Sequence, residues 1–168
     1  MATYYDSITP AQKLLIEEAP VFFVASAAGD LSANPHGGGP LNVSPKGGVK
    51  LFVVDKNRVA YLDFGGSGNE TARHSQTGGP CTVMVMSTTP DDAAVVRLYG
   101  HAKVFALDGY AYQEVFEEAS DPERIGLAQR QVIEVTVEGT VTSCGYGVPV
   151  MEFRAQRTKL EHGRRYKG

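Results

Sequence analysis

The chain has 168 residues, of which 42% are hydrophobic, enough to bury the core of one compact domain. A formal net charge of −3 leaves no basic field that would favour nucleic acid. No apolar run approaches the length that spans a membrane. We therefore expect one domain over residues 1–168 that binds neither nucleic acid nor membrane.

Residues 9–20 are predicted to form the first helix. Thr9 suits the N-cap, Pro10 suits the first helical position, and Gln12 completes a Thr-x-x-Gln capping box. Pro20 ends the helix. This opening stretch lacks the sustained apolar run of a signal peptide, so a cytoplasmic setting is the default expectation.

Seven segments carry the alternation of apolar and polar residues, or the short apolar runs, that predict β-strands. They are residues 21–28, 41–47, 49–55, 58–64, 80–89, 93–107 and 130–143. Lys56-Asn57 is predicted to turn a tight hairpin. Strict alternation of strands with helices is missing, which argues against a Rossmann sheet and for a largely antiparallel barrel.

The last of these strands is expected to keep one face in water. Its inward residues are Ile133, Val135 and Val137, and its outward residues are Val132, Glu134, Thr136 and Glu138.

Two further short helices are expected. Ser67-x-x-Glu70 forms a second capping box, before a helix that ends at Gly78-Gly79. Asp108 can cap a third helix that follows it.

The segment LNVSPKG, residues 41–47, places an amide, a hydroxyl and an ammonium on one face of a strand. Lys46 is a point charge that can hold a phosphate, and Ser44 can donate to the same group. Asn42 can bond a heterocycle edge. A phosphorylated ring compound would satisfy all three; the alternative is a half-exposed strand whose polar side faces water.

The segment DFGGSGNETARH, residues 63–74, places a glycine-rich turn before a helix start, where free amides can approach an anion. Ser67, Asn69 and Thr71 add side-chain donors, and Arg73 adds charge. The alternative is that Ser67 only caps the helix. The segment matches neither the P-loop nor the dinucleotide fingerprint.

The histidines and cysteines give no metal-ligand spacing. His36, His74, His101 and His162 stand apart from one another, and Cys81 and Cys144 form no Cys-x-x-Cys pair. We expect no metal, and we expect Cys144 to be structural rather than redox-active, with Gly145 and Gly147 shaping a turn.

Taken in order, NVSPKG, a hairpin, AYLDFGGSGNETARH, a strand and VVRLYGHAKV resemble the pyridoxamine 5′-phosphate oxidase-like family, the FMN-binding split barrels. The resemblance covers roughly residues 21–106, and TSCGYGVPVMEF near the C-terminus is similar to the ending of a bacterial subgroup. It implies a mainly β (α+β) fold, a six-stranded antiparallel split β-barrel with a few short helices. It also implies a homodimer that binds one FMN per subunit at the subunit interface.

The resemblance also implies the cofactor-binding positions. Lys46 matches the family's phosphate contact, and Arg97 lies in a strand that carries a flavin-edge contact. The full implied set is Asn42, Val43, Ser44, Lys46, Tyr61, Leu62, Asp63, Ser67, Gly68, Asn69 and Arg97. The family commonly has a second cationic side chain where Gly68 and Asn69 stand, and Arg73 is the candidate to replace it.

True pyridoxamine phosphate oxidases close with a tryptophan-containing substrate segment and an Arg-Leu ending. This chain has no tryptophan and ends LEHGRRYKG, so the vitamin-B6 activity is not carried over. We expect an FMN flavoprotein that transfers hydride or electrons to a small organic substrate, with no catalytic acid or base identified. Two alternatives stay open: a non-catalytic flavin or haem binding module, and an F420-dependent reductase on the same barrel.

Overall fold

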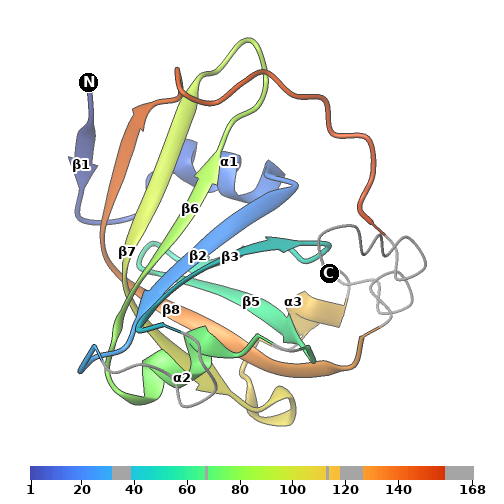
Figure 1. The fold of residues 1–168 in the computed structure, drawn as a ribbon. Helices are drawn as coiled ribbons and strands as arrows, with labels where there is room; N and C mark the ends of the chain where they lie inside the picture. Colours follow the sequence, from blue (N-terminus) through green and yellow to red (C-terminus); the bar gives the residue numbers. More distant parts are fainter. Residues whose placement is uncertain (32–38, 67, 113, 118–126, 158–168) are drawn as a thin grey trace.

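The computed structural model describes residues 1–31, 39–66, 68–112, 114–117 and 127–157, and these form one antiparallel sheet with short helices at its ends (Figure 1). The elements in chain order are β1 (Thr3–Tyr5), α1 (Pro10–Glu18), β2 (Val21–Ala27), β3 (Leu41–Gly47), β4 (Phe52–Asp55), β5 (Arg58–Phe64), α2 (Glu70–Gln76), β6 (Pro80–Met86), β7 (Ala94–Phe105), the 3₁₀ turn η1 (Leu107–Gly109), α3 (Glu114–Glu117) and β8 (Gln129–Cys144). No helix in the described part of the chain is long and apolar enough to cross a membrane.

The sheet has eight strands, so the six implied by the family resemblance were wrong for this chain. Their order is β3-β2-β6-β7-β8-β5-β4, and β1 pairs with β8 outside this path. All seven strands expected from the sequence are present. The eighth, β1, is three residues long and pairs Thr3 with Thr142 and Tyr5 with Thr140. A segment that short carries no readable alternation.

The order of the strands leaves β3 and β4 at the two edges of the sheet. β4 pairs with only the first part of β5, from Arg58 to Ala60. The remainder of β5 is therefore open on that side, and Figure 1 shows the sheet curling so that β3 and β5 approach each other.

The main core fills the inside of this curled sheet. Alternate residues of each strand point inward and are almost completely buried, among them Phe22, Val24, Val83, Leu98 and Val135. Burying a side chain of this size contributes roughly 1.5–3 kcal/mol. This core fixes which face of each strand points inward, and so fixes the direction of the polar residues that line the site.

A second apolar cluster covers the outer side of β5 and β8. Leu62 and Val132 pack there beneath Tyr110 and Phe116 from the η1–α3 segment. The expected wet face of β8 was therefore wrong at Val132 and Glu134, which are buried, and right at Thr136 and Glu138, which are exposed. The covering segment comes from elsewhere in the chain, so the pattern of β8 alone could not indicate it.

The first helix and the hairpin follow their predictions. In α1, the Gln12 amide N–H donates to Thr9 Oγ1 (3.2 Å), and the Thr9 N–H donates to Gln12 Oε1 (3.0 Å), which completes the capping box. In the hairpin turn, the Asn57 N–H donates to the Asp55 carboxylate (2.8 Å). This hydrogen bond is the main cause that lowers the pKa of Asp55.

The other two helices begin later than predicted. The N-cap of α2 is Asn69, which makes no side-chain capping bond, and the predicted cap Ser67 lies outside the described residues. Asp108 lies inside the 3₁₀ turn η1, and α3 begins only at Glu114. The end of α2 agrees with its prediction, since Gly78 has a φ of 69°, a left-handed conformation that glycine adopts readily.

Candidate functional site

The three polar side chains of β3 share one face, as the alternation predicted, and the structure turns this face inward, which the sequence left open. Asn42, Ser44 and Lys46 are half-buried, whereas Leu41 and Val43 on the opposite face are 69% and 67% exposed. The inward face meets β5 and the start of α2 at a small pocket with a cavity volume of about 30 Å³. We call it the Lys46 pocket, and its polar lining includes Ser44, Lys46, Tyr61, Asp63, Asn69 and Glu70.

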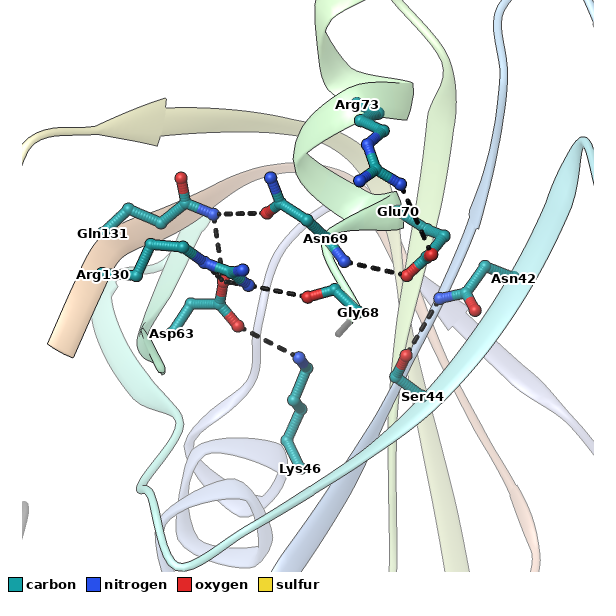
Figure 2. Close-up of polar contacts among 10 residues, drawn as sticks. All are labelled: Asn42, Ser44, Lys46, Asp63, Gly68, Asn69, Glu70, Arg73, Arg130 and Gln131. Carbon is teal, nitrogen blue, oxygen red and sulfur yellow. Dashed lines mark hydrogen bonds and ion pairs between the residues drawn. The ribbon is translucent and has the colours of Figure 1, made fainter. Parts of the chain in front are cut away.

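Asp63 is the centre of the polar contacts in this pocket (Figure 2). Its side chain is only 8% exposed. Lys46 Nζ lies 3.2 Å from Oδ1, while Arg130 Nη2 lies 2.6 Å from Oδ2. Gln131 Nε2 also donates to Oδ2, at 3.0 Å. A buried carboxylate is tolerated only when it is paired and hydrogen-bonded in this way.

Arg130 supplies the second cation of the site, which the sequence reasoning missed. Besides its contact with Asp63, its Nη2 donates to the carbonyl oxygen of Gly68 (2.8 Å). Arg73, the expected replacement, instead lies 3.6 Å from the Glu70 carboxylate. No local pattern in the sequence points to Arg130, because it reaches Asp63 only through the pairing of β5 with β8, where Asp63 lies opposite Gln131.

The turn before α2 has a carboxylate of its own. Glu70 Oε2 accepts from the Asn69 N–H at 2.9 Å, which is one of the amides expected to face an anion. Asn69 Oδ1 accepts from Gln131 Nε2 at 2.9 Å, so the turn is tied to β8. The Glu70 carboxylate thus occupies the position beside the Asn69 amide where a bound anion was expected.

Tyr61 contributes a hydroxyl that has no partner. Its side chain is fully buried and lines the Lys46 pocket, and its hydroxyl is the one buried side-chain polar atom in the described residues that lacks a hydrogen bond. Burial, and then the charge of Asp63, raise the pKa of Tyr61, so the hydroxyl keeps its proton. The Thr71 hydroxyl offsets a little of this effect, although the two groups form no well-aligned hydrogen bond. An unsatisfied buried donor of this kind calls for a water or ligand atom beside it.

The remaining predicted residues lie in different places. Asn42 donates to Ser44 Oγ at 2.9 Å and so lies beside the pocket. Val43 lies on the outer face of β3, and Leu62 is buried in the outer cluster. Arg97 donates to Ser143 Oγ at 3.1 Å and does not line the pocket. The structure therefore gathers Ser44, Lys46, Tyr61, Asp63, Gly68 and Asn69, while Val43, Leu62 and Arg97 lie outside the pocket.

Metal-ligating and thiol groups are not gathered anywhere in the described residues. No group of three histidine, cysteine or acidic side chains within the described ranges could hold a metal. Cys81 is buried, which raises the pKa of its thiol to about 12, and Cys144 is exposed. Gly145 lies so close to Ala94 that a Cβ would meet its backbone nitrogen at 2.7 Å, so this glycine does shape the chain as predicted.

Comparison with known proteins supports the family resemblance that the order of the motifs indicated. No protein-family model matches the chain. A pyridoxamine 5′-phosphate oxidase family protein, ustO of Aspergillus flavus, is 31% identical over 157 residues, which are 91% of this chain. The resemblance to the pyridoxamine 5′-phosphate oxidase-like family is confirmed. The chain spans 58% of the length of that relative.

Solved structures of this family share the fold. A candidate pyridoxamine 5′-phosphate oxidase from Lactobacillus delbrueckii has a TM-score of 0.56 at 20% identity, and the match covers 81% of this chain and 94% of that one. A pyridoxamine 5′-phosphate oxidase-related, FMN binding protein from Nostoc punctiforme has a TM-score of 0.50 at 11% identity, covering 77% and 76%. At these identities the similarity to the solved structures of the pyridoxamine 5′-phosphate oxidase-like family is a similarity of fold.

Proposed function

We propose that the chain binds FMN with its phosphate in the Lys46 pocket, and that it serves as an oxidoreductase for a small organic substrate. The observation that carries this proposal is the unpartnered Tyr61 hydroxyl, buried in a pocket that also presents Lys46 and Ser44. The Tyr61 residue, the Lys46 ammonium, which lies 5.6 Å from the centre of the Tyr61 ring, and Ser44 line one pocket. Ammonium and hydroxyl donors of this kind suit phosphate oxygens.

The charges of the site allow an anion. Lys46, Arg73 and Arg130 contribute three positive charges, while Asp63 and Glu70 contribute two negative ones. The surplus is one positive charge. Asp63 would repel a phosphate, so its role is to orient Lys46 and Arg130 rather than to contact the ligand.

The size of the pocket suits one end of the cofactor only. Its cavity volume of about 30 Å³ lies far below the roughly 300–1,000 Å³ of pockets that enclose whole drug-sized ligands. The flavin ring would therefore lie outside it, along β3, where Asn42 could bond the ring edge. When bound, FMN would supply hydride or electron transfer, and the residues described here would bind and orient it.

A second copy of the chain is proposed to pack against the outer face of β3. Leu41 and Val43 expose apolar side chains on β3, an edge strand, beside a shallow hollow that also includes Ala25 and Thr82. Exposed apolar residues on a sheet edge indicate a surface that pairs with another chain. A homodimer, as in the expectation from the family, fits this surface. The name of the Nostoc punctiforme neighbour, an FMN binding protein, adds support at the level of fold.

The test is titration of the purified protein with FMN and with riboflavin, which lacks the phosphate. Lys46→Ala should weaken FMN binding by about 30- to 150-fold, which corresponds to about 2–3 kcal/mol for one charge-assisted contact. Riboflavin binding should not change. Lys50→Ala is the matched control, because Lys50 is exposed and does not line the pocket.

Equal retention of FMN by Lys46→Ala and the parent would show that the phosphate assignment is wrong. The absorbance of the protein as purified separates the alternatives. A flavin spectrum that NADH or NADPH bleaches supports the oxidoreductase, whereas a haem spectrum supports the carrier module.

A further inference from the structure

A second hollow region lies at the end of the barrel where α1 packs, and it shares no lining residue with the Lys46 pocket. One hollow, with a cavity volume of about 240 Å³, lies between α1 and residues 86–92. The other, with a cavity volume of about 480 Å³, lies between residues 88–90 and residues 150–153. The two share Glu18, Pro20, Thr88 and Thr89, so they form one continuous depression, which we call the acidic groove.

The segment after β8 forms one wall of this groove and is held at two points. The Met151 N–H donates to the Thr88 carbonyl oxygen at 3.0 Å. Gln156 Nε2 donates to the Pro20 carbonyl oxygen at 2.8 Å. Figure 1 shows this segment, the red trace beyond β8, passing outside the sheet. Because hydrogen bonds fix this segment at Met151 and at Gln156, it packs against the rest of the domain.

The surface of the groove is largely apolar. Leu14 is 58% exposed on the α1 side, and Val150 and Phe153 are 67% and 54% exposed on the opposite wall. Pro20 lies between them, where the two hollows meet. Apolar residues that surround a concave surface are typical of sites that bind small molecules, whereas single apolar residues scattered on a surface need no such explanation.

The charged residues of the groove all have the same sign. Glu18, Asp92 and Glu152 are exposed carboxylates, and no lysine, arginine or histidine lines either hollow. Within the described ranges none of these three carboxylates makes an ion pair or a hydrogen bond. Elsewhere on the surface, carboxylates such as Asp55 and Glu138 do have cationic or imidazole partners. The groove thus combines apolar walls with negative charge that nothing in the described chain balances.

We propose that the acidic groove binds a small organic ammonium ion with an apolar body. The apolar part would contact Leu14, Pro20 and Phe153, and the ammonium group would lie near Glu18, which belongs to both hollows. Thr88 and Thr89 add oxygen acceptors beside it. Carboxylate anions of the same shape would be repelled by the same three acidic side chains. The proposal does not depend on FMN binding.

Octylammonium, octanoate and 1-octanol are matched probes that differ in charge, and isothermal titration below micellar concentrations measures each. We expect one octylammonium per chain, and binding of octanoate that is at least about tenfold weaker. Glu18→Gln should weaken octylammonium binding by about fivefold, the effect of one exposed ion pair worth roughly 1 kcal/mol. Glu114→Gln is the control, since Glu114 is an exposed carboxylate on α3 that lines neither hollow.

Three results would overturn the proposal: no octylammonium binding, octanoate binding as tight as octylammonium, or equal effects of Glu18→Gln and Glu114→Gln. The groove could instead be covered by a second copy of the chain. Sedimentation would then show a dimer that Leu14→Glu dissociates, together with no octylammonium binding by the parent, and this also contradicts the proposal. FMN titration in parallel tells the two sites apart, because Glu18→Gln should leave FMN affinity unchanged.

Discussion

Asp63 and Glu134 are two carboxylates buried to a similar extent on neighbouring strands, with side chains 8% and 10% exposed, and their surroundings differ. Asp63 lies at the edge of a pocket between Lys46 and Arg130. Glu134 lies on the outer side of β8, where it accepts from the Tyr110 hydroxyl at 2.7 Å and has Arg58 at 3.7 Å.

The difference between these carboxylates separates a binding role from a structural one. Around Asp63 the cations outnumber the nearest carboxylate, and a donor, the Tyr61 hydroxyl, is left without a partner beside it. Around Glu134, the hydroxyl of Tyr110 donates a hydrogen bond to the carboxylate, and the Tyr110 ring packs on Phe105 and Phe116. Burial of a charge therefore marks a candidate site only where unsatisfied groups and space accompany it.

The largest expected effect on stability is that of Asp63→Asn. Removing the carboxylate leaves Lys46 and Arg130 without their shared counter-charge, and breaking a buried pair in this way costs about 3 kcal/mol. Urea unfolding should show this loss in the free energy of unfolding. Glu138→Gln, which affects an exposed pair with His101, is the control and should cost far less. Similar losses in both variants would mean that the Asp63 contacts contribute no more than surface pairs.

Glu134→Gln is expected to cost about 1 kcal/mol of unfolding free energy, because it weakens a charge-assisted hydrogen bond from Tyr110 but keeps an acceptor. FMN affinity should not change, since Glu134 lines no part of the Lys46 pocket. Urea unfolding and FMN titration together measure both quantities. A clear loss of FMN affinity in Glu134→Gln would contradict the assignment of a purely structural role to Glu134.

Tyr61→Phe is expected to have the smallest effect on stability, within about 0.5 kcal/mol, because the hydroxyl that it removes has no partner in the free protein. FMN affinity should nevertheless fall about fivefold, as expected for the loss of one hydrogen bond. Tyr110→Phe is the matched control, with a loss of stability and unchanged FMN affinity. If Tyr61→Phe left FMN binding intact, the hydroxyl would have no role in the site.

Local sequence patterns predicted the parts of the site that depend on one strand alone. That Asn42, Ser44 and Lys46 share one face follows from the two-residue period of β3, whereas the inward direction of that face is set by the core of the barrel. The capping box of α1 and the hairpin turn at Lys56-Asn57 are equally local, and both are confirmed.

Parts of the site that depend on pairing between distant segments were beyond reach of the sequence. Arg130 meets Asp63 only because β5 pairs with β8 in one register, and 67 residues separate the two in the chain. The predicted start of α2 was wrong: its N-cap is Asn69, and the Glu70 carboxylate, predicted to complete a capping box, accepts from the Asn69 N–H. The predicted positions for FMN stay predictions until the cofactor is bound.

The boundary between β3 and β5, where the two strands are not hydrogen-bonded to each other, has a consequence for how the barrel is held closed. β4 pairs only as far as Ala60, so the ladder that joins neighbouring strands elsewhere does not extend across from Tyr61–Phe64 to β3. The ion pair between Lys46 on β3 and Asp63 on β5 joins the two strands through their side chains. Separating β3 from β5 would therefore break side-chain contacts but no row of main-chain hydrogen bonds. A ligand that contacts both strands would stabilise the barrel by joining them.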